Sequence, residues 1–156
     1  MVTSFTRILT YFLTFLMGSM VLAVTWQIFT RFILNDPSIY SEEIAGFLLI
    51  WIGMLGSTFA LHKKSHIAID ILTKNLKGSQ KVLSESIISC IVILFALTVL
   101  VIGGSRLVYI TFTLNQISPA LGIKMAYVYL VVPLSGLIMI TYSIDIIKDS
   151  LEQSSV

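Results

Sequence analysis

Four long stretches without a charged side chain set the limits on how this 156-residue chain can fold. No Asp, Glu, Lys or Arg occurs at residues 8–30, 44–61, 86–105 or 125–144, which are 23, 18, 20 and 20 residues long. A helix needs about 20 mainly apolar residues to cross a bilayer. Strands of a membrane barrel would alternate polar and apolar residues, and these stretches do not. Each stretch is therefore predicted to be a transmembrane helix.

The composition excludes the other broad classes of protein. Charged residues make up 12% of the chain and hydrophobic residues 56%, and a soluble domain of this size could not bury so much apolar surface. Disordered chains are polar and rich in charge. The single cysteine, Cys90, has no partner for a disulfide, and a net charge of +2 does not indicate nucleic-acid binding. The fold class is predicted to be an all-α integral membrane protein.

The charges also predict the orientation. We expect a single membrane domain over residues 1–156, with spans at about 8–34, 44–61, 82–107 and 125–147. The first span is longer than the apolar region of a signal peptide, and no small-x-small cleavage site follows it, so we expect it to be retained. Both termini are expected in the cytoplasm because seven of the ten basic residues lie on their side. These are Arg7, Lys63, Lys64, Lys74, Lys77, Lys81 and Lys148.

The first connection carries a helix-start signal. Ser41 offers a hydroxyl cap, and Glu42 and Glu43 place negative charge in the first helical turn, where the helix dipole favours it. A second interpretation is that Arg31, just inside the membrane boundary, pairs with one of the two glutamates. Since a charge near a helix end can also reach water by itself, both interpretations stay open.

The second predicted span carries small residues near one face. Gly53, Gly56 and Ala60 belong to this stripe, and small side chains allow transmembrane helices to pack closely. Either this chain's own bundle or another membrane protein could occupy that face. Trp51 lies near the middle of the same span, where we expect it to fill a groove between packed helices.

The second connection predicts a short amphipathic helix over about 66–77. His66, Asp70, Lys74 and Lys77 share a polar face, and its lysines suit contact with anionic membrane lipids. His66 and Asp70 lie one helical turn apart. A proton-handling or metal-binding pair is one interpretation. Two ligands without a third are weak support for a metal, so structural hydrogen bonding is favoured and no metal site is predicted.

The third connection and the last two spans contain helix-breaking residues. Ser118-Pro119 favours an extended entry, and Gly122 supplies a turn before the last helix. Gly103-Gly104 and Pro133 are candidate kinks.

Signatures of catalysis are missing from the sequence. It contains no HExxH, no GxSxG and no glycine-rich phosphate loop, so we expect no enzyme and no catalytic residue. The middle of each predicted span lacks an ionisable side chain, whereas such residues usually mark an ion or substrate path. The chain is therefore not expected to transport a solute by itself.

Several motifs together resemble a known family, the small membrane (Q-type) subunit of tripartite ATP-independent periplasmic (TRAP) transporters. They occur in order between about residue 20 and residue 133. The pieces are Arg31-Phe32 with Pro37, Tyr40-Ser-Glu-Glu43, Trp51-Ile-Gly53 with Gly56 and Ala60, His66-Ile-Ala-Ile-Asp70, and Ser118-Pro-Ala-Leu-Gly122 with Tyr127 or Tyr129 and Pro133. Tyr40 stands where the family often has Trp, and Lys124 lies near a common proline.

The resemblance implies a role beside a larger protein. In such transporters a periplasmic binding protein delivers an organic acid anion, of the sialic acid or C4-dicarboxylate type, to a large polytopic subunit that imports it with sodium. The small subunit is expected to brace that subunit in the bacterial inner membrane. Sodium and substrate would bind in the partner, so we expect no cofactor in this chain. The motif residues would then be interface or structural residues. They are Arg31, Glu42, Glu43, Trp51, Gly53, Gly56, Ala60, His66, Asp70, Ser118 and Pro119.

Three other classes were weighed. A small multidrug exporter needs an acid inside its first helix, and this chain has none. A haem-carrying respiratory subunit needs histidines in facing helices, whereas His62 and His66 lie at or beyond the end of the second span. An anchor or assembly subunit of an unrelated complex stays as the alternative.

Overall fold

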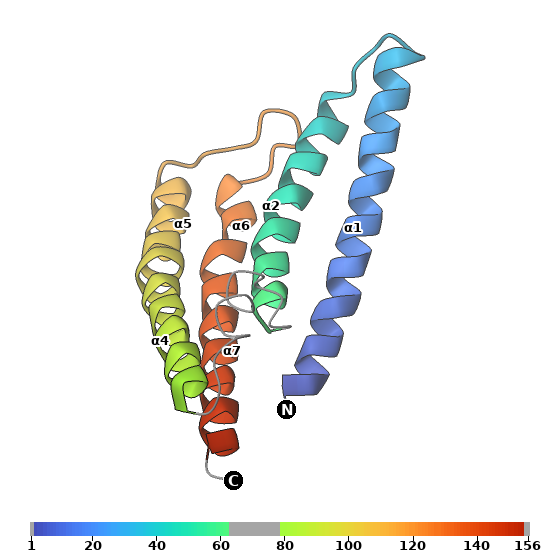
Figure 1. The fold of residues 1–156 in the computed structure, drawn as a ribbon. Coiled ribbons are helices and arrows are strands. Elements are labelled where there is room, and N and C mark those ends of the chain that lie inside the picture. Colours follow the sequence, from blue (N-terminus) through green and yellow to red (C-terminus); the bar gives the residue numbers. More distant parts are fainter. Residues whose placement is uncertain (1, 63–78, 155–156) are drawn as a thin grey trace. The chain divides into compact units, whose positions relative to one another are not determined.

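A computed structural model describes residues 2–62 and 79–154 of the chain (Figure 1). It is 86% helical, and no residue of the described part belongs to a strand. The elements are α1 (Val2–Phe32), α2 (Ile39–His62), α4 (Ser79–Phe95), the π-helix η1 (Ala96–Gly103), α5 (Gly104–Thr113), α6 (Met125–Tyr129) and α7 (Val131–Ser154). Helix is the expected conformation, because a segment in lipid must satisfy its backbone hydrogen bonds internally.

Within the described ranges, four helical segments are long and apolar enough to cross a membrane. They are Phe5–Phe32, Ile39–His62, Leu83–Thr113 and Met125–Ser150. The predicted all-α membrane class with four spans is confirmed. The helices extend past several predicted ends, because charged side chains near the membrane boundary can reach water without ending the helix. The third span, for example, continues to Thr113 rather than 107. The amphipathic helix predicted at 66–77 lies outside the described residues.

The chain divides into two compact units. The single membrane domain expected from the sequence remains a prediction. The first unit comprises Met1–Gly56 and Leu107–Val131, and the second comprises Ser57–Arg106 and Val132–Val156. In the first unit, α1 runs antiparallel to the first part of α2 (Figure 1). Leu9, Leu13 and Leu16 are buried on α1, at the spacing that places residues on one helical face.

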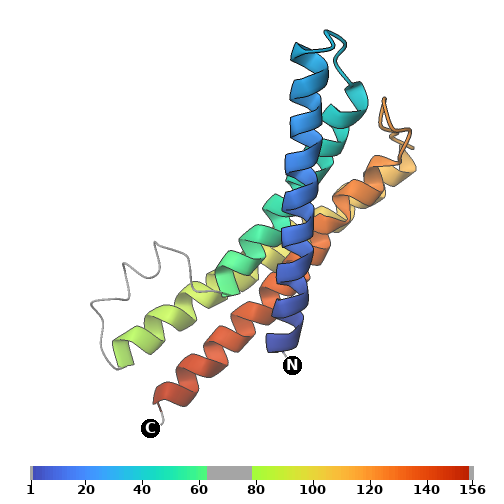
Figure 2. The same cartoon turned by 90° about the vertical axis from the view of Figure 1, so that its right-hand side faces the viewer.

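In the second unit, α4 and η1 run beside α7 (Figure 2), and two glycines allow the close approach. A Cβ atom added to Gly136 would lie 2.7 Å from Cβ of Leu100 and 3.3 Å from the carbonyl oxygen of Ala96. One added to Gly104 would lie 2.8 Å from Cγ1 of Val132. The sequence analysis considered Gly104 only as a kink. Close packing against another helix is the constraint that the structure adds.

The candidate kinks coincide with changes in helix type. The π-helical segment η1 ends at Gly103, and regular α-helix resumes at Gly104. Pro133 follows an interruption at Leu130, which separates α6 from α7. Proline lacks the N–H that would bond to the carbonyl four residues earlier, here that of Tyr129, and its ring crowds that carbonyl. The break therefore has a local cause.

We predict that Gly136→Ala destabilises the chain by about 1–3 kcal/mol, because its methyl group overpacks the contact with η1. Gly18→Ala is the matched control, since a Cβ there meets no described atom within 4 Å and alanine is the better helix former. Thermal unfolding in detergent, followed by circular dichroism, measures both variants. Equal midpoints for the two variants would contradict the packing role of Gly136.

Candidate functional site

The third connection, residues 114–124, is an ordered turn closed by backbone hydrogen bonds. The N–H of Ser118 donates to the carbonyl of Ile123 at 2.9 Å, and the N–H of Gly122 donates to the carbonyl of Ser118 at 3.1 Å. Gly122 has a φ of +67°, in the left-handed region that glycine adopts without a Cβ clash. The chain then turns back, and α6 begins at Met125.

Glu43 of α2 binds this turn through one carboxylate oxygen. Its Oε2 accepts hydrogen bonds from Oγ of Ser118 at 2.5 Å, from the N–H of Ala120 at 3.2 Å and from the N–H of Leu121 at 2.8 Å. Ser118 is only 2% exposed, so its hydroxyl has restricted access to solvent partners, and Ala120 and Leu121 are half-buried. Pro119 stands between the donors and itself offers no N–H. We name this cluster, Glu43 with residues 118–121, the Glu43 clamp.

The clamp unites two sequence motifs that the sequence alone could not connect. Glu43 and Ser118 are 75 residues apart in the chain, and both were predicted as interface or structural residues. The sequence assigned Glu43 either to a helix start or to an ion pair with Arg31. The structure instead pairs it with a hydroxyl and two backbone donors. The turn at residues 114–124 and the start of α2 are thereby fastened to each other within the first unit.

One part of the predicted helix-start signal is confirmed, because Glu42 lies in the first turn of α2. The position of the cap and the ion pair with Arg31 differ from the expectation. The helix start predicted at Ser41 is in fact at Ile39, and the Ser41 hydroxyl donates to the carbonyl of Ser38 at 3.0 Å. Among the described residues, no ion pair joins Arg31 to Glu42 or Glu43. Arg31 and Glu42 are both exposed. A serine before a glutamate pair marks the neighbourhood of a helix start, but Ser38 offers the same signal three residues earlier.

The small residues of α2 do not pack as Gly104 and Gly136 do. A Cβ added to Gly46, Gly53 or Gly56 would meet no atom of the structure within 4 Å. Gly46 and Gly53 are exposed, whereas Gly56 and Ala60 are half-buried. The close approach that these residues allow is therefore not used by a described neighbour.

Trp51, also on α2, is half-buried and has a partner in its own chain. Its ring meets that of Phe12 on α1 edge to face, with ring centres 6.3 Å apart and planes at 69°. Such an arrangement suits the charge distribution of aromatic rings. The groove expected for Trp51 thus lies at least partly between α1 and α2.

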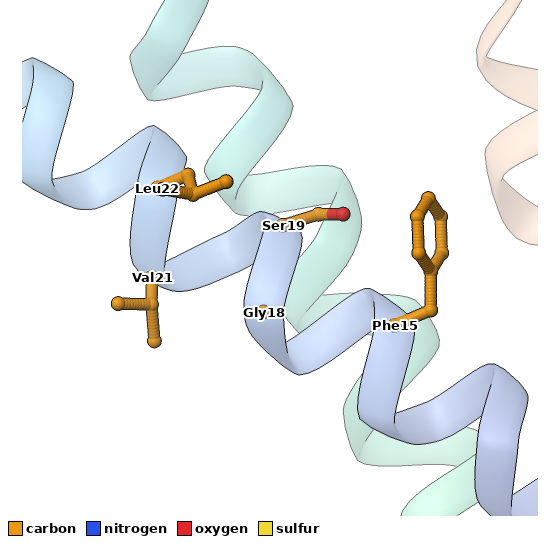
Figure 3. Close-up of a pocket in the computed structure, with 5 residues that line it drawn as sticks. All are labelled: Phe15, Gly18, Ser19, Val21 and Leu22. Atoms are coloured by element: carbon orange, nitrogen blue, oxygen red, sulfur yellow. The ribbon is translucent and has the colours of Figure 1, made fainter.

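A shallow apolar recess lies along α1 at Gly18, where the helix lacks a side chain (Figure 3). Its volume is about 520 Å³, and Phe15, Ser19, Val21 and Leu22 line the rest of it. It holds one hydroxyl and no charge. The recess has the character of a surface that packs against apolar chains rather than of a site that binds a polar solute.

The second unit has polar links of its own. The hydroxyl of Ser150, which is 2% exposed, donates to the Glu85 carboxylate and so joins α7 to α4. His62 stacks on the buried Tyr142 with ring centres 4.4 Å apart. Glu85 lies near the start of the predicted span 82–107, but the sequence does not identify its partner, because several serines could have served. The predicted pair His66 and Asp70 lies outside the described residues.

These features define a multi-pass helical membrane protein. No group of three metal-ligating side chains gathers in the part of the chain that the structure describes, and the polar clusters found there join helices and turns. The sequence carries the family assignment: residues 20–152 match the family described as Tripartite ATP-independent periplasmic transporters, DctQ component. The chain belongs to this family. It is a transporter component and not an enzyme, as predicted.

The names of individual related proteins agree with this family assignment. The chain is 39% identical over 61 residues to the sialic acid TRAP transporter small permease protein SiaQ of Vibrio cholerae, a match covering 39% of this chain and 35% of that protein. It is 45% identical over 47 residues to the sialic acid TRAP transporter permease protein SiaT of Haemophilus influenzae, covering 30% of this chain and 8% of SiaT. It is 30% identical over 125 residues to the isethionate TRAP transporter permease protein DctMQ of Oleidesulfovibrio alaskensis, a match covering 76% of this chain and 20% of DctMQ. The chain therefore spans about a third or less of these relatives.

We predict that Glu43→Ala lowers the free energy of unfolding by about 1–3 kcal/mol, because the Ala120 N–H and the buried Ser118 hydroxyl lose their acceptor and the Leu121 N–H keeps only its longer bond to Ser118 Oγ. The neighbouring Glu42→Ala is the matched control, since Glu42 is exposed and such changes usually stay within about 0.5 kcal/mol. Unfolding midpoints in detergent measure both. The amides of Ala120 and Leu121 should also exchange faster in Glu43→Ala. Unchanged exchange would contradict the clamp.

Proposed function

We propose that this chain is the small permease subunit of a sodium-coupled importer of an organic acid anion, and that it braces the large transport subunit. The family match over residues 20–152 carries the proposal. The polar contacts of the chain also support a bracing role, since the polar clusters at Glu43 and Glu85 hold helices and turns together. Substrate and sodium would both bind in the large subunit. A periplasmic binding protein would deliver the substrate to it.

The long relatives support the large subunit as partner. The segment similar to this chain makes up 20% of DctMQ and 8% of SiaT. A small-subunit segment within a much longer permease chain suits two parts that work side by side in one membrane.

The exposed face of α2 is the proposed docking surface. Glu42, Gly46, Leu49 and Gly53 are all exposed, and they recur at helical spacing along one side. Without a hydrophobic driving force in lipid, helices associate through close packing, which glycines permit. Gly46 and Gly53 leave room for bulky side chains of a partner helix. Arg31, Trp51, Gly56, Ala60, His66, Asp70, Ser118 and Pro119 stay proposed as interface or structural residues.

The proposal also includes the orientation of the chain in the membrane and the class of substrate. The excess of basic residues on the side of the termini supports cytoplasmic termini in a bacterial inner membrane. The relatives SiaQ and DctMQ are named for sialic acid and isethionate. Both are organic acid anions, which supports that substrate class without selecting one member, and C4-dicarboxylates belong to the same class.

Copurification tests the docking face. A tagged chain should bring down the large subunit, and Gly53→Leu should reduce its recovery about tenfold or more, because the added side chain fills the space for the partner helix. Gly18→Leu on α1 is the matched control and should retain the partner. Unfolding midpoints of both variants separate lost docking from misfolding. If folded Gly53→Leu still recovers the partner fully, α2 is not the docking face.

Reconstitution tests the transport role. In proteoliposomes holding the small and large subunits, uptake of radiolabelled sialic acid, isethionate or a C4-dicarboxylate should need the binding protein and an inward sodium gradient. Leaving out this chain should abolish uptake of the accepted anion. Replacing sodium with potassium is the control for coupling. Full uptake by the large subunit without this chain would contradict the proposed role.

A further inference from the structure

We propose that Arg106 binds the phosphate of a membrane phospholipid in the leaflet at the Thr113 end of α5. Arg106 is the sole charged residue between Glu85 and Lys124. The predicted third span, 82–107, ends one residue beyond it. The structure continues the helix to Thr113, so the guanidinium belongs to a membrane helix, where an anionic headgroup can pair with it.

The helix directs Arg106 away from the helix packing of its unit. Gly104, two residues earlier, faces Val132 and Pro133 of α7 at contact distance. Two residues along a helix correspond to a rotation of about 200°. Arg106 accordingly lies on the other side, and it is exposed. Ile102, one turn earlier, is 60% exposed and apolar.

The position of Arg106 along the membrane helix favours a lipid headgroup as its anionic partner. Seven residues separate Arg106 from the end of α5 at Thr113, which is about 10 Å along the helix axis. The polar headgroup layer is about 5–7 Å thick on each side of the hydrocarbon core. With Thr113 placed at the outer face of the headgroup layer, the backbone of Arg106 lies near the hydrocarbon boundary, and its flexible stem can extend toward the headgroups. Tyr109, one turn nearer the helix end, is 70% exposed, as interfacial aromatic residues commonly are.

Guanidinium chemistry fits this partner. A planar fork of N–H donors matches two oxygens of a phosphate at once, and a charged hydrogen bond at the edge of the hydrocarbon region is stronger than one in water. A guanidinium left without a partner in hydrocarbon is costly. The inference depends only on α5 lying in a membrane and is independent of the transport role.

Lipid retention tests the proposal. The purified full chain is exchanged into phosphatidylglycerol, extracted with mild detergent and analysed by native mass spectrometry. Arg106→Gln should lower the retained phosphatidylglycerol about tenfold, the effect of losing charged hydrogen bonds. Arg7→Gln is the matched control, because Arg7 is also an exposed helical arginine, and it should retain the lipid. Arg106→Lys keeps the charge without the fork and should give an intermediate value.

Two further arms identify the ligand. Diacylglycerol, which has no phosphate, should not be retained by the unmodified chain, and excess inorganic phosphate should not displace phosphatidylglycerol. Equal retention by the unmodified chain and Arg106→Gln overturns the proposal. So does a loss of large-subunit copurification in Arg106→Gln at unchanged lipid retention, which would assign Arg106 to a carboxylate of that subunit. Unfolding midpoints verify that each variant is folded.

Discussion

A backbone N–H in the hydrocarbon layer finds no water, so the chain itself must supply the acceptor. Within the spans, helices supply it. Where the chain leaves the helix at residues 114–124, the Glu43 clamp and the carbonyls of the turn take over this task. One carboxylate oxygen accepts two backbone donors and a serine hydroxyl. The turn lies beyond the membrane-spanning helix that ends at Thr113, and it is held by hydrogen-bond acceptors of the chain itself rather than by helical hydrogen bonds.

Glycine has two distinct uses in this protein. Gly104 and Gly136 stand where a neighbouring helix leaves no space for a side chain. Gly18, Gly46 and Gly53 meet no neighbour in the described structure, which leaves hollows on the outside of α1 and α2. The first kind joins helices within a unit. The second kind leaves surface hollows that lipid or another protein can fill, and the proposed docking of the large subunit depends on those at Gly46 and Gly53.

The sequence predicted the helices well because their signal is local. A run of uncharged apolar residues is sufficient to place a span, and Gly122 is sufficient to predict a turn. Contacts between distant residues were beyond its reach. Nothing near Glu43 in the sequence points to Ser118, and nothing near Glu85 points to Ser150. Both pairs depend on how helices stand beside one another. The same holds for Gly136, whose need for a small side chain arises entirely from η1. The helix ends were the other weakness: the third span was predicted to end at residue 107, whereas the helix continues to Thr113.

The π-helical segment at Ala96–Gly103 has a consequence for everything that follows it. Each residue advances a regular helix by about 100°, so the number of residues in this segment sets the rotation of α5 about its axis. Removing one residue would turn Arg106 by roughly a quarter of a revolution, while the apolar character of the span would remain the same. The length of the π-helical segment, and not the identity of its side chains, therefore sets the direction in which the Arg106 guanidinium points.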